Sequence, residues 1–262
     1  MTNNNVLILT DIEGISGVSC IEAINQDTRE YREACENLMK DTNLAIQALL
    51  DAGADKIYVV DGHGKGTNFI KNELHASANQ ITVDEMSSAI KDVSCVVLVG
   101  MHAMSGTLSA FLDHTQSSIK IHNYFYNGKR IGEISQIATF AGHFGVPCVA
   151  VTGDEAACAE AAAIIDGIFS ASVKTARCRN RADCLSPDVA AERIYNATRT
   201  GFASRFNVKP MLTQLPLHVS VEFNRSDYCD EACESNPKIT RTDAFTATSV
   251  KTKIEDYHDV LL

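Results

Sequence analysis

Three short, unbroken apolar runs constrain the fold of this chain more than any other feature. They comprise residues 6–9, 57–60 and 93–99, and each is followed directly by polar residues and glycines. Unbroken apolar runs are typical of strands that are covered on both faces, as in parallel sheets. Between the first two runs, residues 29–51 carry apolar side chains at helical spacing, and Gly53 follows where such a helix would end. The order strand, helix, strand predicts parallel βαβ units.

The chain after residue 120 has a different pattern. Residues 121–126 lead into Asn127-Gly128, and Asn-Gly between β-like segments is a strong hairpin signal. Further helices are predicted over residues 134–143, 154–167 and 187–205, and further strands over 147–151 and 217–223. We expect the strand over 217–223 to lie near the edge of a sheet.

Charge and cysteine usage limit the possible partners. The formal net charge is −10, which argues against binding to nucleic acid or to an anionic membrane, because both need faces rich in Lys and Arg. The first residues, MTNNNVLILTD, lack the basic region of a secretory signal, and the longest apolar stretch, residues 93–101, is about half a membrane span. The nine cysteines are scattered without a CxxC pair, as in a reducing cytosol. We therefore expect a cytoplasmic protein with a small-molecule or protein partner.

Chemically active side chains follow the three predicted strands. Asp11 and Glu13 come directly after the first strand, His63 follows the second, and His102 follows the third. The carboxyl ends of parallel strands meet at one edge of the sheet, where open α/β folds bind their ligands. Carboxylates and imidazoles together are ligands of zinc and are tolerated by manganese or cobalt. Glu133, which follows the predicted hairpin, would add a further carboxylate to this metal site.

Each of these residues taken alone has a simpler interpretation. An Asp-x-Glu pair at a strand end can be a solvated loop or a helix cap. His63, flanked by glycines, can be a turn residue, and His102 can be a half-buried imidazole with a hydrogen-bond partner. Asp61 can be a hydrogen-bond acceptor that orients His63 as a metal ligand, while Lys65 and Asn68 can face a substrate or a neighbouring subunit. A metal site is favoured because all of these residues are expected at the same edge of the sheet.

Several motifs along nearly the whole chain resemble those of the D-aminopeptidase family of metallopeptidases. They are Asp11-Ile12-Glu13-Gly14-Ile15-Ser16-Gly17, Asp61-Gly62-His63-Gly64-Lys65, Gly100-Met101-His102-Ala103, Asp113-His114, Gly132-Glu133-Ile134, Gly145-Val146-Pro147, Val151-Thr152-Gly153-Asp154-Glu155, Cys184-Leu185-Ser186-Pro187 and Val221-Glu222-Phe223. The resemblance implies two zinc ions that share Asp11. It places Glu13 and His63 with one ion and His102 and Glu133 with the other, and it implies a catalytic role for His114.

The same resemblance implies an activity. The chain is expected to be a dinuclear zinc aminopeptidase that uses a metal-activated water to release an N-terminal residue, such as D-alanine, from short peptides or amides. Mn²⁺ or Co²⁺ can replace zinc with such ligands. His114 can act as a base or as a nucleophile. Three alternatives stay open. The first is a dinuclear hydrolase of other amides, such as cell-wall stem peptides, and the second is a metallophosphoesterase, although no basic cluster accompanies the metal motifs. The third is a binding or scaffold protein that retains the fold, although all five matched ligand positions are intact. Relatives in this family imply a homo-oligomer, a ring-like homodecamer.

Taken together, these patterns predict an α/β fold: a mostly parallel sheet with flanking helices and a smaller C-terminal α+β portion. We assign residues 1–175 to the metal-binding, catalytic α/β domain and residues 176–262 to the smaller portion. The weakest pattern lies over residues 210–216. No linker separates the two parts, so they can also form one continuous domain.

Overall fold

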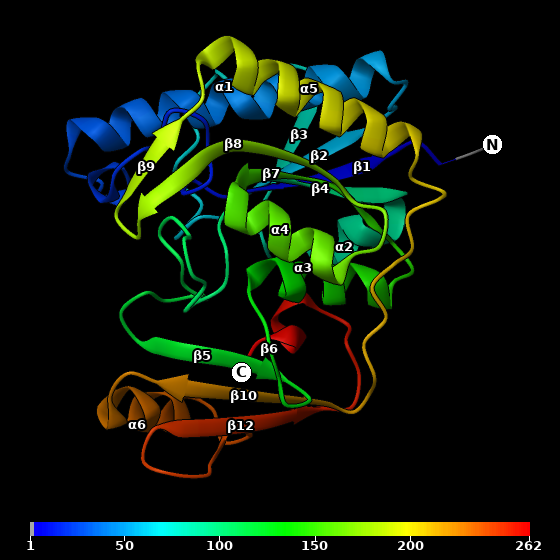
Figure 1. Ribbon diagram of the computed structural model, residues 1–262. Helices are drawn as coiled ribbons and strands as arrows, with labels where there is room; N and C mark the ends of the chain where they lie inside the picture. The colour runs from blue at the N-terminus through cyan, green and yellow to red at the C-terminus, as the bar shows by residue number, and fades with distance from the viewer. Residues whose placement is uncertain (1–2) are drawn as a thin grey trace.

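The computed structural model describes residues 3–262, which form two β-sheets (Figure 1). The larger sheet has seven strands in the order β3-β2-β1-β4-β7-β8-β9. Its strands are β1 (Val6–Thr10), β2 (Ile57–Asp61), β3 (Ala78–Ile81), β4 (Cys95–Met101), β7 (Cys148–Asp154), β8 (Phe169–Cys178) and β9 (Arg181–Cys184). Neighbouring strands are parallel except for β8 and β9, which are antiparallel. The predicted, mostly parallel sheet is confirmed.

Helices cover both faces of this sheet, as unbroken apolar strands require (Figure 1). On one face, α1 (Arg29–Asp51) packs beside α5 (Pro187–Ala203), and on the other lie α3 (Glu133–His143) and α4 (Glu155–Ile164). Helix α1 has the predicted range, and the side chain of Thr28 caps it by accepting a hydrogen bond from the Tyr31 backbone nitrogen. Shorter helical segments are α2 (Met86–Ala89), η1 (Ile21–Ile24), η2 (Ile90–Asp92) and η3 (Tyr257–Val260).

The smaller sheet has five strands in the order β11-β12-β10-β5-β6. They are β5 (Ile121–Tyr126), β6 (Lys129–Arg130), β10 (Leu217–Phe223), β11 (Thr240–Arg241) and β12 (Thr246–Lys251), and α6 (Ser226–Ser235) packs against β10 and β12. The predicted hairpin is confirmed: Asn127 and Gly128 both have positive φ angles, +49° and +80°, as a two-residue turn requires. The predicted edge position of residues 217–223 is wrong. Strand β10 is central, because β5 pairs with it from nearly 100 residues earlier in the chain.

The chain passes between the two sheets more than once, so neither sheet is built from one continuous part of the sequence. The predicted boundary between residues 175 and 176 falls within β8, while β5 and β6 reach the smaller sheet from the N-terminal side of that boundary. The C-terminal segment is held on β5, where the Tyr126 hydroxyl donates to the Val260 carbonyl oxygen. The division into two domains stays a prediction. Among residues 3–262, no helix combines the length and the apolar character that a membrane span needs.

Candidate metal centre

The three strands that the sequence singled out are neighbours in the larger sheet. Strand β1 lies between β2 and β4, and Thr10 pairs with both Asp61 and Val99. Because all three strands are parallel, the segments that follow them meet at the same edge of the sheet. These segments carry Asp11, Glu13, His63 and His102.

Two glycines allow the loop after β1 to lie against the end of β4. A Cβ atom on Gly14 would lie 2.1 Å from the Met101 carbonyl oxygen, and one on Gly100 would lie 2.3 Å from the Asp11 carbonyl oxygen. Gly100 also has a φ angle of +78°, which L side chains rarely adopt. Any larger residue at either position would separate the two loops. The glycines therefore bring Asp11 and His102 close together.

The candidate ligands form two groups that meet at Asp11. The ligand atoms of Asp11, Glu13 and His63 lie within 4.8 Å of one another, and so do those of His102, His114 and Glu133. In the first group, Glu13 Oε1 is 3.5 Å from His63 Nε2. In the second, Glu133 Oε1 is 3.5 Å from His102 Nε2. Asp11 Oδ2 lies 3.3 Å from His102 Nε2, so Asp11 has the position that a ligand shared by both groups needs.

The buried atoms of this cluster fit divalent cations. Asp11 Oδ2, Glu13 Oε2 and His102 Nε2 are buried and have no hydrogen-bond partner within residues 3–262. A buried polar atom left without a partner costs free energy. The nitrogen–oxygen distances of 3.3–3.5 Å are long for hydrogen bonds. They are close to the separation of about 3.3 Å between ligands around tetrahedral zinc, whose bonds to nitrogen and oxygen are about 2.0–2.1 Å long.

Burial and neighbouring charges shift the pKa values of the cluster. Burial and the Glu13 carboxylate raise the pKa of Asp11 well above its usual range, although His102 opposes the shift. Burial would lower the pKa of His63, but the carboxylates of Glu13 and Asp11 raise it to about 10. Burial and the His102 imidazole lower the pKa of His114. A divalent cation would relieve the repulsion between carboxylates held this close together out of water.

Each of the three histidines is oriented by a hydrogen bond at Nδ1. His102 Nδ1 lies 3.0 Å from the Ala103 carbonyl oxygen, and His114 Nδ1 lies 2.8 Å from that of Leu112. His63 Nδ1 lies 3.2 Å from Asn68 Oδ1. Since these oxygens can only accept, Nδ1 carries the hydrogen in each ring. The Nε2 atoms then face the cluster, where binding a metal ion or acting as a base would require them to be unprotonated.

Asn68 connects His63 to Asp61. The Asp61 carboxylate accepts hydrogen bonds from the Asn68 backbone nitrogen at 2.6 Å and from Nδ2 at 2.8 Å. The Tyr31 hydroxyl donates to Asn68 Oδ1 at 2.7 Å. Asp61 therefore acts on His63 through Asn68, not by the direct contact that the sequence suggested. Nothing in the local pattern distinguishes Asn68 from an ordinary loop asparagine.

Replacing Asn68 with alanine is expected to weaken metal binding at His63. Partners that orient a metal-bound histidine typically contribute about 10–100-fold to metal affinity. Competition with a chromogenic chelator measures this loss, and Tyr31→Phe should give a smaller one because it removes only one partner of Asn68 Oδ1. Asn79→Ala, an exposed residue of β3, is the control. Unchanged affinity in Asn68→Ala would contradict the orienting role.

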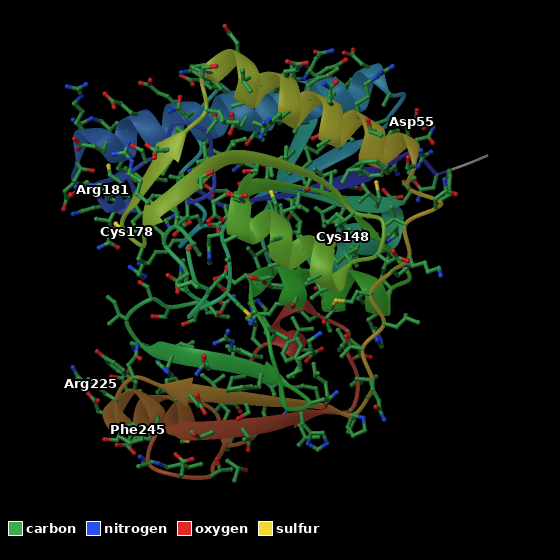
Figure 2. All side chains as sticks on the ribbon, in the orientation of Figure 1. Asp55, Cys148, Cys178, Arg181, Arg225 and Phe245 are labelled. Atoms are coloured by element: carbon green, nitrogen blue, oxygen red, sulfur yellow. The ribbon has the colours of Figure 1, made fainter. Side chains whose placement is uncertain are left out.

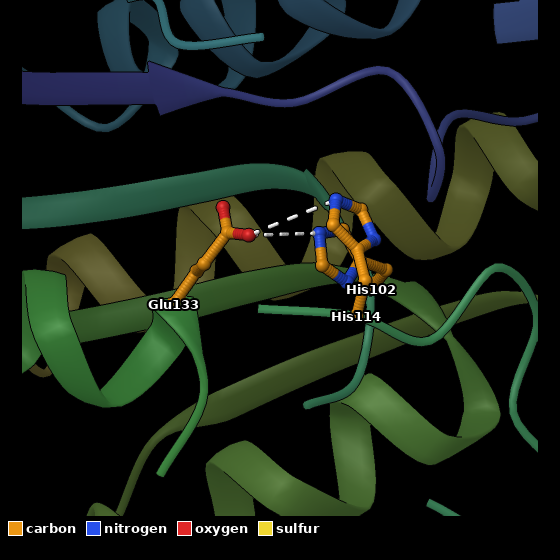
Figure 3. Close-up of side chains that lie close together, drawn as sticks. All are labelled: His102, His114 and Glu133. Carbon is orange, nitrogen blue, oxygen red and sulfur yellow. Dashed lines mark ion pairs between the residues drawn. The ribbon is translucent and has the colours of Figure 1, made fainter. Parts of the chain in front are cut away.

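Glu133 and His114 complete the second group (Figure 3). Glu133 is the first residue of α3, and its Oε1 atom accepts a hydrogen bond from the Gln116 backbone nitrogen at 2.7 Å. The rings of His102 and His114 are stacked, with centroids 3.9 Å apart and planes inclined by 11°. His114 Nε2 lies 3.8 Å from Glu133 Oε1. His114 therefore lies beside the candidate ligands and in contact with His102.

Lys174 belongs to this region, although no sequence motif indicates it. It lies on β8 and is fully buried, and its Nζ atom donates hydrogen bonds to the carbonyl oxygens of Glu13 at 2.7 Å and Val18 at 2.6 Å. It thereby holds the loop that carries Glu13. The mixed sequence of β8 gives no signal for this burial, since lysines are mostly exposed.

A cavity of about 870 Å³ opens onto the cluster. It is lined by Asp11, Glu13, His63, His114 and Glu133, by residues 62–66, 80–85 and 116–119, and by Tyr257, His258 and Leu261, among others. Small-molecule sites commonly have volumes of about 300–1,000 Å³. The cavity is therefore large enough for a small substrate next to the candidate ligands.

Carboxylates and imidazoles gather at the carboxyl edge of this open α/β sheet, beside a cavity. Such an arrangement is typical of metal-dependent hydrolases. Comparison with known families makes the assignment narrower. The family model described as D-aminopeptidase matches residues 5–262, and the chain belongs to this family. The resemblance found in the sequence and the predicted enzyme class, a metallopeptidase, are confirmed.

Two individual proteins are similar to this chain. The D-aminopeptidase of Bacillus subtilis (strain 168) is 27% identical over 218 residues, which cover 81% of this chain and 79% of the relative. The solved structure of the Zn-dependent D-aminopeptidase DppA from Bacillus subtilis, described as a self-compartmentalizing protease, matches with a TM-score of 0.91 at 22% identity. That match covers 98% of this chain and 95% of the other, and it confirms the α/β fold.

Proposed function

We propose that this chain is a zinc-dependent aminopeptidase that releases the N-terminal residue, a D-amino acid such as D-alanine, from short peptides or amides. The observation that carries the proposal is the position of Asp11 between two groups of carboxylates and imidazoles that border a cavity. Membership of the D-aminopeptidase family supports the reaction and the stereochemistry. The zinc dependence stated for the similar solved structure supports the choice of metal.

Five side chains would hold the metal. Asp11 would bind both ions, Glu13 and His63 would bind one, and His102 and Glu133 the other. Zinc bound there would supply a Lewis acid for the peptide carbonyl group and would lower the pKa of water to near 7. Mn²⁺ and Co²⁺ suit the same nitrogen and oxygen ligands.

The stacking of His114 on His102 supports a catalytic role for His114 over a role as a ligand. A metal ion binds an imidazole close to the plane of its ring, along the Nε2 lone pair. The two rings are nearly parallel, with centroids 3.9 Å apart, so the lone pairs of their Nε2 atoms lie in different planes. His102, the ring that also contacts Asp11, would therefore hold the metal, and His114 would stay free to move protons.

His114 is placed to move protons. Its Nδ1 hydrogen is donated to the Leu112 carbonyl oxygen, which leaves the Nε2 lone pair on the side of the cavity. Nε2 would accept the proton of the attacking water and then donate it to the amine that leaves. An imidazole suits both steps, since its unperturbed pKa lies near neutral pH.

Metal content and substrate preference test the proposed function together. Elemental analysis of freshly purified protein is expected to show two zinc ions per chain, one for each group of ligands. The protein should cleave D-Ala p-nitroanilide faster than the L-Ala compound, and a chelator should abolish cleavage until zinc is restored. Bound metal without cleavage of either compound would contradict the substrate, and protein without metal would contradict the mechanism.

The same assay separates the alternatives. A cell-wall stem peptide cleaved faster than D-Ala-D-Ala would indicate a different amide substrate. An aryl phosphate cleaved faster than the aminoacyl anilides would indicate a metallophosphoesterase. The cavity disfavours the phosphoesterase, since Lys65 is the one lysine or arginine among its lining residues within the described chain.

Assembly and location form part of the proposal. We infer a homo-oligomer, a ring-like homodecamer, with support from the description of the similar structure as self-compartmentalizing. The exposed apolar side chains of Leu108 and Ile119, both on the loop between β4 and β5, are candidates for contacts between copies. Sedimentation velocity tests this, and a monomer would contradict it. A cytoplasmic location is supported by the nine cysteines, none of which forms a disulfide.

A further inference from the structure

A tight turn next to His63 places a lysine on the wall of the cavity. The Gly66 backbone nitrogen donates to the His63 carbonyl oxygen at 3.1 Å and closes a four-residue turn. Gly64, at the first central position, has a φ angle of +60°, which a glycine adopts without strain. Lys65 occupies the second central position and lines the cavity. It is therefore only two residues from a candidate metal ligand.

Lys65 is an exposed cation on the wall of this cavity. The carboxylates that line it outside the metal groups all have partners: Asp61 accepts from Asn68, Asp84 Oδ1 lies 3.0 Å from His258 Nε2, and Glu85 accepts from Thr82. Lys65 forms no ion pair or hydrogen bond with any residue from 3 to 262, and no other lysine or arginine of this range lines the cavity. A negative group of the substrate is the natural partner for an ammonium group in this position.

The distance between Lys65 and the candidate metal ligand His63 is compatible with the length of a dipeptide. The C-terminal carboxylate of a dipeptide lies one residue beyond the bond that is cleaved, a distance of about 3.5 Å along the chain. The Cα atoms of His63 and Lys65, two residues apart, are separated by at most about 7 Å. A lysine side chain is long and flexible, so its ammonium group can reach a carboxylate held beside the metal site.

We propose that Lys65 binds the free C-terminal carboxylate of the substrate and so selects dipeptides over peptide amides and longer peptides. This inference rests on the proposed aminopeptidase function and narrows its substrate class. The N-terminal residue would be held at the metal ligands, and the carboxylate of the second residue would bind the Lys65 ammonium group. In a longer peptide, the carboxylate would lie at least one residue, about 3.5 Å, further from the metal ligands, and the contact with Lys65 would be weaker.

Kinetics with D-Ala-D-Ala and its C-terminal amide test the selection. Lys65→Met is expected to raise KM for the dipeptide on the order of tenfold, as for loss of a hydrogen bond to a charged group, with kcat nearly unchanged. The same variant should leave KM for the amide unchanged, and Lys65→Arg should restore most of the preference. Lys71→Met, an exposed lysine outside the cavity lining, is the matched control.

A binding measurement separates failure of this inference from failure of the proposed function. In a zinc-loaded His114→Gln background, calorimetry is expected to show tighter binding of D-Ala-D-Ala than of its amide, and Lys65→Met should remove that difference. Equal binding of both compounds would overturn the role of Lys65 even if the wild-type enzyme cleaves both. An altered sedimentation coefficient in Lys65→Met with an unchanged preference would also overturn it, because Lys65 would then contact another copy. Preferential binding without any cleavage by the wild type would instead overturn the aminopeptidase function alone.

Discussion

Replacement of Asp11 by asparagine is expected to remove both metal ions and to abolish turnover. Asparagine has nearly the same shape and can keep the hydrogen bond that Asp11 Oδ1 accepts from the Ile12 backbone nitrogen. It loses the negative charge, and an amide nitrogen replaces Oδ2, the atom that lies 3.3 Å from His102 Nε2. Because Asp11 lies between the two groups of ligands, both ions should be affected.

Asp11→Asn should lower metal affinity and activity more than any other single substitution at the site. Loss of a partner that merely orients a ligand typically costs about 10–100-fold in metal affinity or activity, and loss of a shared ligand should cost more than that. Elemental analysis and kcat/KM with D-Ala p-nitroanilide measure the two consequences. Two tightly bound ions in Asp11→Asn would contradict the bridging position.

Asp55→Asn is the matched control for Asp11. Asp55 is exposed and lies just before β2, at the opposite end of the strand from the site (Figure 2). Its backbone nitrogen bonds to the Asn4 carbonyl oxygen, near the start of β1. The same chemical change there should leave metal content and activity as in the wild type, since exposed carboxylates away from the ligands contribute little.

Replacement of His114 by glutamine is expected to retain the metal and to lose turnover. General acid–base groups typically contribute about 10²–10⁴-fold to rate, so kcat should fall by about this factor while elemental analysis still shows the wild-type metal content. The reason is geometric. His102 Nε2 lies close to the carboxylates of Asp11 and Glu133, whereas His114 is stacked against the face of the His102 ring.

The metal content of this variant decides between two roles for His114. Loss of one ion would show that His114 is a ligand, as its grouping with His102 and Glu133 also allows. A near-normal rate with full metal content would contradict both roles. His122→Gln, an exposed histidine of β5, is the control and should change neither quantity.

Much of the larger sheet could be predicted because its strands are local apolar runs. The runs at β1, β2 and β4 are buried on both faces, and a run of that kind is visible in the sequence without knowledge of its neighbours. The sequence pattern does not predict strands β3, β8 and β9, and the reason is clearest for the two strands β3 and β8. β3 has only half-buried or exposed residues, and β8 mixes a buried half with an exposed half, so neither has a distinct pattern.

The smaller sheet was harder to predict for a different reason. The hairpin at Asn127-Gly128 was evident because the turn chemistry is local. The pairing of β10 with β5, on one side, and β12, on the other, depends on contacts between distant segments. No property of residues 217–223 alone distinguishes a central strand from an edge strand when one face is exposed, since both then alternate.

The sequence by itself determined the residue types of the candidate site and the sheet edge at which four of them collect. Strand ends are local features, and parallel order follows from the helix between strands, so Asp11, Glu13, His63 and His102 could be placed together without coordinates. Only the tertiary structure decided what surrounds them. Three contacts show this: Asn68 with His63, Lys174 with the loop that carries Glu13, and the ring of His114 on that of His102. The residues in these contacts are not linked by any repeating pattern in the sequence. Such contacts depend on how folded loops and strands pack in three dimensions, and no local pattern of residues encodes that packing.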